Sequence, residues 1–284
     1  MNNVLEVSGL NKSYGTFQLK DVNFTLPENC ITGFIGINGA GKTTTIKSIL
    51  GLVPKDSGTV KAFGKDMGKY EREIKNRIGI VLDEGAFYEE LTMSEMKSIV
   101  APAYSRWNEN EYRSCMERFD LNPQQKISTL SKGMRMKFSL VLALSHEADL
   151  LIMDEPTSGL DPLIRNQFMN ILLEFMKKEG KSVFFSTHIT SDLDKVADMI
   201  ILINDGQIVF EEEKDALLDT YKIVKGNPQE LFDKTRKLFL SIQETEYSFT
   251  GITKNAVEIK SACKNILTEK PAIEDIMLGF IGGK

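Results

Sequence analysis

The fold is decided by the stretch Gly36-Ile37-Asn38-Gly39-Ala40-Gly41-Lys42-Thr43, which has the glycine spacing of a phosphate-binding loop followed by lysine and threonine. An apolar run at residues 30–35 precedes it, and residues 44–50 after it favour a helix. The pattern therefore lies where a buried strand turns into a helix, which is the context that such a loop requires.

The chemistry of this loop follows from its residue types. Glycines let backbone N–H groups close around a polyphosphate, and the helix that begins there adds partial positive charge. Lys42 can reach the terminal phosphates, and the hydroxyl of Thr43 can ligate Mg²⁺. The alternative is a glycine-rich turn that binds nothing.

Length and composition restrict the possible classes of protein. The 284 residues suffice for one large α/β domain and a smaller appendage, and 42% hydrophobic with 26% charged residues is ordinary for a folded protein. The net charge is −5 and no run of Lys and Arg occurs, so the sequence gives no support to nucleic-acid binding.

Targeting and membrane signals are also missing from the sequence. The first residues lack the charged start and apolar core of a secretory signal, and no segment approaches the ~20 apolar residues of a membrane span. The three cysteines, Cys30, Cys115 and Cys263, are too far apart to suggest a disulfide framework or a zinc site. We expect a reducing cytosol, with any membrane connection made through a partner.

Apolar runs alternate with helical segments after the phosphate loop. Buried strands are predicted at residues 77–82, 149–155 and 182–186, and helices at residues 94–119, with a break near Pro102, and 162–178. This alternation predicts a mostly parallel sheet covered by helices, in which ligands bind beyond the carboxyl ends of the strands. Four residues at strand ends are therefore expected to share one crevice: Gly36, Asp83, Asp154 and His188.

The remaining segments are predicted from turn and alternation signals. Residues 4–26 read as short strands, with Tyr14 in a turn at residues 12–15. A hairpin is expected across Asp205-Gly206, strand-like alternation runs over residues 221–260, and a terminal amphipathic helix begins at Pro271.

Asp154 and Glu155 supply the carboxylates that phosphate chemistry needs. One would hold Mg²⁺, and the other would polarise a water for attack on the γ-phosphate. The alternative is a pair of solvated acids at an ordinary strand end. His188 also has two interpretations. It is either a polar residue at a strand end or a group that hydrogen-bonds the γ-phosphate or orients Glu155.

In their order along residues 4–212, these motifs resemble the ATP-binding subunits of ABC transporters. The segments that carry the resemblance are a Walker A loop (36–43), a signature (130–134), a Walker B strand (150–154), a D-loop (159–161) and a switch histidine after Thr187. The resemblance implies an α/β fold: a P-loop NTPase core with a mostly parallel sheet, an N-terminal antiparallel β subdomain and a helical subdomain near residues 84–130. The ATPase domain would span residues 1–213, and residues 214–284 would form an α+β accessory extension.

The resemblance also implies roles for individual residues. Glu155 and His188 would be catalytic, and Thr43, Asp83 and Asp154 would bind Mg²⁺. Tyr14 would stack on adenine. The other implied ATP contacts are Asn38, Gly39, Ala40, Gly41, Lys42, Thr43, Thr44, Asp83, Ser131 and Gly133. Three residues depart from the family pattern, because Asp83 replaces a glutamine, Lys132 a glycine and Met134 a glutamine.

The implied partners are a second cassette, identical or paralogous, and a polytopic membrane subunit. ATP would lie between the phosphate loop of one cassette and Ser131 and Gly133 of the other. Export from the cytoplasmic face of the membrane, where the chain would be peripheral, is the leading expectation. The sequence has one Walker A and no long coiled-coil insertion, which argues against the translation-factor and chromosome classes of the family and favours transport. A soluble regulatory ATPase without a membrane partner is the alternative.

Two surfaces have open interpretations. Phe87 and Tyr88, within residues 85–92, either dock a helix of the membrane subunit or belong to the core of the helical subdomain. The terminal helix packs either on its own cassette or on the second one.

Overall fold

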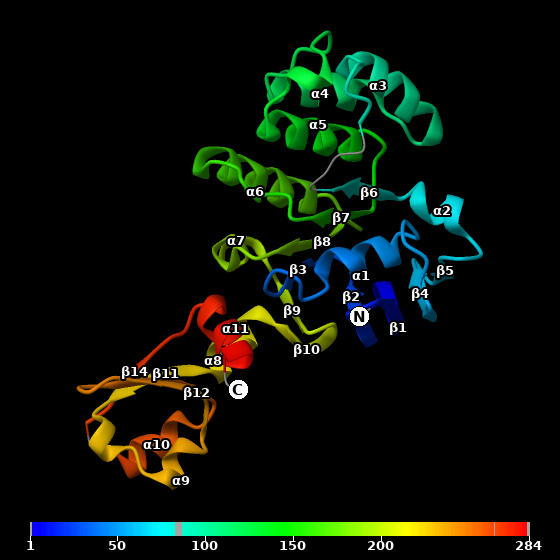
Figure 1. Ribbon diagram of the computed structural model, residues 1–284. Helices are drawn as coiled ribbons and strands as arrows, with labels where there is room; N and C mark the ends of the chain where they lie inside the picture. The colour runs from blue at the N-terminus through cyan, green and yellow to red at the C-terminus, as the bar shows by residue number, and fades with distance from the viewer. Residues whose placement is uncertain (1, 83–86, 264, 283–284) are drawn as a thin grey trace.

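A six-stranded sheet forms the centre of the molecule in the computed structural model, which describes residues 2–82, 87–263 and 265–282 (Figure 1). Its strands run in the order β10 (Gln207–Glu213), β9 (Met199–Asn204), β3 (Ile31–Ile35), β8 (Ser182–Thr187), β7 (Leu150–Asp154) and β6 (Ile78–Val81). All neighbours are parallel except β10, which pairs antiparallel with β9. The predicted mostly parallel sheet is confirmed, as is the hairpin across Asp205-Gly206.

Both faces of this sheet are covered, which explains why its strands are continuously apolar. Phe184 of β8 faces the N-terminal sheet, where its ring lies 5.3 Å from that of Phe34 and 5.6 Å from that of Phe24. Phe185, the next residue, faces the opposite core together with α6 (Pro162–Met176). α1 (Lys42–Ile49) lies on the Phe184 side, with its residues Ile46 and Ile49 fully buried.

The N-terminal sheet is antiparallel, with the order β2 (Phe17–Pro27), β1 (Asn3–Tyr14), β4 (Ser57–Ala62) and β5 (Lys65–Asp66). The prediction of short strands was wrong, because β1 and β2 are long and accommodate register shifts instead of breaks. The position of Tyr14 was also wrong: it ends β1, and the turn follows at Gly15 and Thr16. The short helix α2 (Glu71–Lys75) leads from this sheet into β6.

The helical subdomain contains α3 (Met93–Val100), α4 (Glu109–Arg118) and α5 (Lys132–Leu144), at the top of Figure 1. The break near Pro102 is confirmed as a 3₁₀ turn at Ala101–Ala103, because proline removes a backbone donor from the helix. A second 3₁₀ turn at Ile127–Thr129 precedes α5. Thr92 and Glu95 form a capping box that starts α3.

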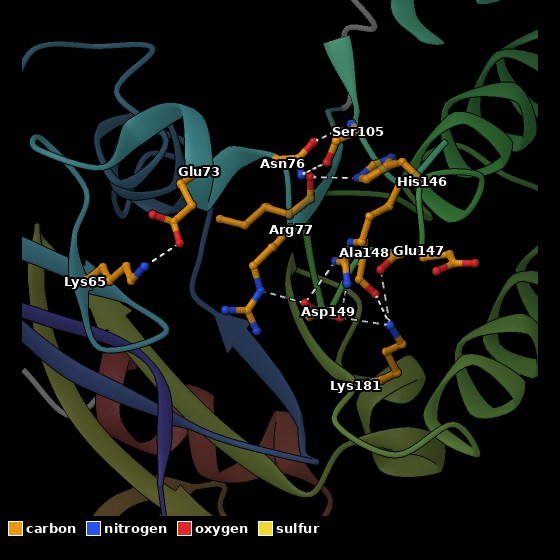
Figure 2. A network of polar contacts seen from close by, with 12 residues as sticks. Lys65, Glu73, Asn76, Arg77, Ser105, His146, Glu147, Ala148, Asp149 and Lys181 are labelled. Atoms are coloured by element: carbon orange, nitrogen blue, oxygen red, sulfur yellow. Dashed lines mark hydrogen bonds and ion pairs between the residues drawn. The ribbon is translucent and has the colours of Figure 1, made fainter. Parts of the chain in front are cut away.

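A polar network ties this subdomain to the amino ends of the central strands (Figure 2). Asp149, directly before β7, accepts hydrogen bonds from Arg77 Nε at 2.7 Å, Arg106 Nη2 at 3.0 Å and Lys181 Nζ at 3.0 Å. Burial alone would raise the pKa of Asp149, but these three donors outweigh it and lower the pKa to about 2. Asn76 Nδ2 adds a hydrogen bond to Ser105 Oγ at 2.7 Å.

The C-terminal extension begins with α8 (Lys214–Thr220), directly after β10. Its antiparallel sheet has the order β12 (Phe239–Glu244), β13 (Phe249–Thr253), β11 (Lys222–Gly226) and β14 (Leu267–Glu269). The strand-like alternation predicted for residues 221–260 is correct only in part, because the 3₁₀ turn Pro228–Glu230 and the helices α9 (Asp233–Arg236) and α10 (Ala256–Ala262) interrupt it. The terminal helix α11 (Ile273–Gly282) starts two residues after Pro271.

α11 packs on its own chain, between the C-terminal sheet and α7 (Thr190–Val196), as Figure 1 shows. Of the two packing arrangements considered for this helix, the contact with its own cassette is the one observed. In the described part of the chain, no helix combines the length and apolarity needed to cross a bilayer.

Candidate functional site

The phosphate loop joins β3 to α1 and is shaped by its glycines. Gly39 and Gly41 have φ angles of 82° and 115°, in the left-handed region that favours glycine. Gly36 is needed for space, because a Cβ there would collide with the backbone oxygen of Ile203. The loop therefore lies directly against β9 at Gly36, whereas a Cβ at Gly39 would meet no atom of the described residues within 4 Å.

The β9–β10 turn supports the loop from behind. Asp205 and Gly206 have φ angles of 46° and 74°, as a two-residue hairpin turn requires. The N–H of Gly206 donates to the carbonyl oxygen of Ala40 at 3.0 Å. The carbonyl oxygen of Gly206 accepts from the N–H of Lys20 at 2.8 Å. The turn thus fixes the phosphate loop against the N-terminal sheet.

Lys42 is the first residue of α1, and its ammonium group is held over the loop. It donates to the carbonyl oxygens of Gly36 at 2.8 Å and Ile37 at 3.3 Å. Its Nζ also lies 3.1 Å from Glu155 Oε1, although the Lys42 side chain is only 5% exposed. A buried ammonium group with few fixed anions near it suits a ligand with several negative oxygens.

Asp154 ends β7 and is almost completely buried. Burial raises its pKa, while hydrogen bonds from Ser186 and Thr43 act in the opposite direction and the neighbouring Glu155 adds to the rise. The Ser186 hydroxyl donates to Asp154 Oδ1 at 2.6 Å. A buried carboxylate beside the Thr43 hydroxyl is a hard-oxygen donor set that would be stabilised by a cation.

Glu155 adopts a left-handed backbone conformation with φ of 48°, which is uncommon for a residue with a side chain. Its N–H donates to Ser186 Oγ at 3.0 Å. Its Oε2 lies 2.7 Å from His188 Nδ1 and accepts from the His188 N–H at 3.3 Å. The turn aims the carboxylate at Lys42 and His188 together.

Lys42, Glu155 and His188 line one cleft of about 500 Å³ over the phosphate loop. Eight residues that the sequence predicted line it: Asn38, Gly39, Gly41, Lys42, Thr43, Thr44, Glu155 and His188. Ala40 lies behind the loop, where it is buried. Asp154 lies beneath the cleft and reaches it through Thr43 and Glu155.

Other predicted residues lie elsewhere. Tyr14 is 46% exposed and stands opposite Phe17 in the β1–β2 pairing, outside the cleft lining. Ser131 and Gly133 lie at the start of α5, where Ser131 Oγ accepts from the Met134 N–H at 3.2 Å. Asp83 falls outside the described residues.

Three residues at the site were missed by sequence reasoning. Phe17 and Ser158 line the cleft, and the Phe17 ring packs so closely that its Cζ would lie 3.0 Å from a Cβ at Gly41. The Ser186 hydroxyl donates to the Asp154 carboxylate and accepts from the backbone N–H of Glu155. The place of Ser186 near the end of a predicted strand was a usable signal, whereas Phe17 requires the observed hairpin register.

The donor set fits a magnesium ion held partly by a substrate. Within residues 2–82, 87–263 and 265–282, no group of three or more His, Cys, Asp or Glu side chains is placed to hold a metal. Mg²⁺ in nucleotide sites is held through one or two carboxylates and substrate phosphates, and therefore needs no such protein cage.

Comparisons with known proteins agree with this geometry. A family model described as ABC transporter matches residues 19–158. The chain is 33% identical over 220 residues to the bacitracin transport ATP-binding protein BcrA of Bacillus licheniformis, covering 76% of this chain and 72% of that protein. It is 32% identical over 236 residues to the lantibiotic transport ATP-binding protein SrtF of Streptococcus pyogenes, covering 82% and 100%.

Solved structures extend the comparison to the fold. A structure described as an ATP-binding subunit of an ABC transporter superposes with a TM-score of 0.69 at 29% identity, over 76% of this chain and 92% of that one. A dimeric ATP-binding cassette bound to ADP and phosphate gives a TM-score of 0.65 at 23% identity, over 74% and 98%. The second likeness concerns the fold alone.

Proposed function

This chain belongs to the ATP-binding proteins of ABC transporters, and from that premise we propose that it pairs with a second cassette around two ATP molecules to drive export through a separate membrane subunit. As a member of that family it binds and hydrolyses ATP. The observation that carries the hydrolysis step of the proposal is the meeting of Lys42, Glu155 and His188 in one cleft over the phosphate loop.

In the proposed reaction, the γ-phosphate takes the place of Glu155 as the partner of Lys42. Glu155 is then free to accept a proton from the attacking water as the bond to ADP breaks. His188 holds Glu155 through Nδ1, and Ser186 fixes its backbone. Thr43 and Asp154 would hold Mg²⁺, which neutralises charge on the phosphate oxygens; Asp83 is proposed as a further ligand.

The base would lie at the β1–β2 end of the cleft. Tyr14 is proposed to stack on adenine, and Phe17, its partner across the hairpin, lines the cleft beside the phosphate loop. The two rings come from adjacent strands at one end of the hairpin. They would therefore flank the base and ribose rather than the phosphates.

Ser131 and Gly133 are proposed to act on the nucleotide of the second cassette. Both lie at the start of α5, outside the cleft of their own chain, and the helix start offers N–H groups and a favourable dipole to a γ-phosphate. The partner is either a second copy or a paralogue. ATP would hold the pair closed, and hydrolysis would release it.

Mixing two inactive variants tests this composite site. Lys42→Ala chains lack a working phosphate loop, and Ser131→Arg chains block the nucleotide of their partner. A mixed pair still contains one intact loop facing one intact serine, so the mixture should hydrolyse ATP faster than either variant alone. Full activity of Ser131→Arg alone would contradict the proposal.

The membrane subunit is proposed to dock beside the helical subdomain. A groove of about 190 Å³ is lined there mainly by apolar side chains, among them Leu82, Phe87, Met96 and Tyr104. Phe87 also packs on Phe138 with ring centroids 5.3 Å apart, so it belongs in part to the core. An apolar groove of this kind suits a short helix.

Substitution of Tyr88 tests docking without disturbing the core, because this side chain is 64% exposed. Tyr88→Asp should abolish recruitment to membranes that contain the transporter's membrane subunit and leave ATP binding intact. Tyr247→Asp, at a tyrosine that is 83% exposed in the C-terminal extension, is the matched control and should leave both intact. Equal recruitment of the two variants would place the docking surface elsewhere.

Export of a peptide, antibiotic or lipid-like cargo is proposed from the relatives named for bacitracin and lantibiotic transport. The chain would work as a peripheral protein on the cytoplasmic face of the membrane, with residues 1–213 as the ATPase domain and residues 214–284 as an accessory extension. Co-purification from membranes with a polytopic protein would support this role. A chain that stays free of membranes would instead favour a soluble regulatory ATPase.

A further inference from the structure

We propose that the terminal helix α11 is a positioning element for His188, acting through α7, so that the C-terminal extension influences the hydrolysis step. This inference rests on the proposed role of His188. It goes beyond that role because it assigns a catalytic influence to a helix outside the nucleotide cleft.

His188 lies between β8, which ends at Thr187, and α7, which begins at Thr190, so the position of α7 helps to set the position of the histidine. The inner face of α7 fits tightly on β3. Leu193 is fully buried, and a Cβ added at Gly33 of β3 would collide with its side chain. α7 therefore cannot move toward the sheet.

α7 also holds the segment that follows Glu155. Asp192 is 2% exposed and accepts a hydrogen bond from Thr157 Oγ1 at 2.8 Å and another from Arg165 Nη2 at 2.5 Å. Thr157 lies two residues after Glu155. The same short helix thus anchors both residues of the Glu155–His188 contact.

α11 packs against α7 (Figure 1). Its buried residues Ile273, Ile276 and Met277 join the same hydrophobic cluster as Leu193 and Val196 of α7. Together with the contacts that Arg165 and Asn166 of α6 make to α7, this packing limits movement of α7.

The far side of α11 is fixed to the C-terminal sheet and to β10. A Cβ at Gly279 would lie 3.1 Å from Leu240 Cδ2, and the ring centroids of Phe280 and Phe210 are 5.2 Å apart. A displacement of the extension is therefore passed to α7. Close-packed contacts of this kind transmit small shifts because they leave no free volume to absorb them.

The expected signature is a change in kcat with little change in KM. The phosphate loop is supported by Gly206 in the β9–β10 turn, and Phe17 comes from the N-terminal sheet. α11 packs on Phe210, four residues beyond Gly206, so its effect on ATP binding should be small. The contact between His188 Nδ1 and Glu155 Oε2, at 2.7 Å, depends on α7. A misplacement of about 1 Å at such a contact costs up to ~10²-fold in rate.

Ile276→Ala tests the inference, with Ile259→Ala as its matched control. Both isoleucines are fully buried in the extension, but Ile259 of α10 belongs to a separate cluster with Val224 and Phe249. Ile276→Ala should lower kcat about tenfold and leave the KM for ATP within about twofold. Ile259→Ala, which removes the same atoms, should leave both constants unchanged.

Thermal melts identify the folded fraction, and Ile276→Val provides a milder variant if Ile276→Ala unfolds. In a His188→Ala background, Ile276→Ala should cause no further loss, because the positioned group is gone. Equal kcat losses in the Ile276 and Ile259 variants, or losses that add to that of His188→Ala, would overturn the inference. An active His188→Ala variant would instead refute the proposed role of His188, and the positioning role with it.

Discussion

Asp149 directly precedes β7 and Asp154 ends it, so this one strand has a partly buried carboxylate before it and a buried carboxylate at its end. Asp149 receives three cationic donors, and its pKa is lowered to about 2. Asp154 receives only hydroxyl hydrogen bonds among the contacts described above, and burial raises its pKa. The charge of Asp149 is balanced by cationic side chains within the fold. Asp154 lacks such donors among these contacts, so its negative charge would be stabilised by a bound cation.

This difference separates a structural carboxylate from a functional one by physical criteria. Asp149 forms ion pairs with Arg77, Arg106 and Lys181, which come from three different segments of the chain. Its charge therefore serves to hold these segments together. At the other end, the left-handed turn of Glu155 and the burial of Asp154 are costs that packing does not explain. Such costs persist where a ligand or a reaction offsets them.

Glu155→Gln should give the largest effect of any change at β7. Loss of the proposed general base lowers kcat about 10³-fold, while ATP still binds and holds two cassettes in a long-lived dimer. Steady-state turnover and size-exclusion chromatography with ATP measure the two results. Glu147→Gln makes the same substitution beside Asp149 and should change neither; unchanged turnover of Glu155→Gln would remove Glu155 from its role.

Asp154→Asn should separate activity from stability at the site end. Because charge stabilisation by a metal ion is worth several kcal/mol, kcat/KM with Mg-ATP should fall about 100-fold. The thermal midpoint of the nucleotide-free protein should not fall, since burial disfavours the Asp154 charge. A lowered midpoint with normal kcat/KM would make Asp154 a structural residue like Asp149.

Asp149→Asn should have the opposite profile. The lowering of its pKa from 3.8 to about 2 corresponds to about 2 kcal/mol of stability at neutral pH. Because the folded-state pKa is lowered, this contribution is present above about pH 4 and is lost as the pH falls toward about 2. The difference in unfolding free energy from the unmodified protein should shrink over that interval, while kcat at neutral pH stays unchanged.

Denaturant titrations between pH 7 and pH 2 measure this difference. A constant difference across the whole range would show that the Asp149→Asn substitution disturbs packing rather than charge. Asp154→Asn, measured in parallel, should not show this acid-dependent change in unfolding free energy. The two variants would then distinguish the stabilising carboxylate of Asp149 from that of Asp154.

The sequence predicted the site end of β7 better than the opposite end. Residues 36–43 and Asp154-Glu155 have local patterns, since a loop or a strand end determines their chemistry. The Asp149 network has none, because Arg77, Arg106 and Lys181 come from distant parts of the sequence and meet only in the fold. For the same reason the sequence left open whether the terminal helix packs on its own cassette or on the second one, and it did not indicate the contact of α11 with α7.

Register explains the remaining differences. The sequence identified Tyr14 from its position in a motif, but whether Tyr14 or Phe17 lines the cleft depends on how β1 pairs with β2. The interruption of residues 221–260 by α9 and α10 was missed because short helices carry too few residues to establish a helical period.

Phe17→Leu should give the smallest effect and extend the comparison to aromatic residues. Phe17 lines the cleft at the site end, and Phe63 lies beneath the Arg77 guanidinium, 3.7 Å from the ring centroid, near the Asp149 end. Leucine keeps apolar volume but loses the flat face on which a base stacks, worth about 1 kcal/mol. Phe17→Leu should therefore raise the KM for ATP about fivefold with kcat unchanged, while Phe63→Leu leaves KM unchanged. Fluorescent ATP analogues titrated in parallel report binding directly, and equal affinities of the two variants would assign base stacking to Tyr14 alone.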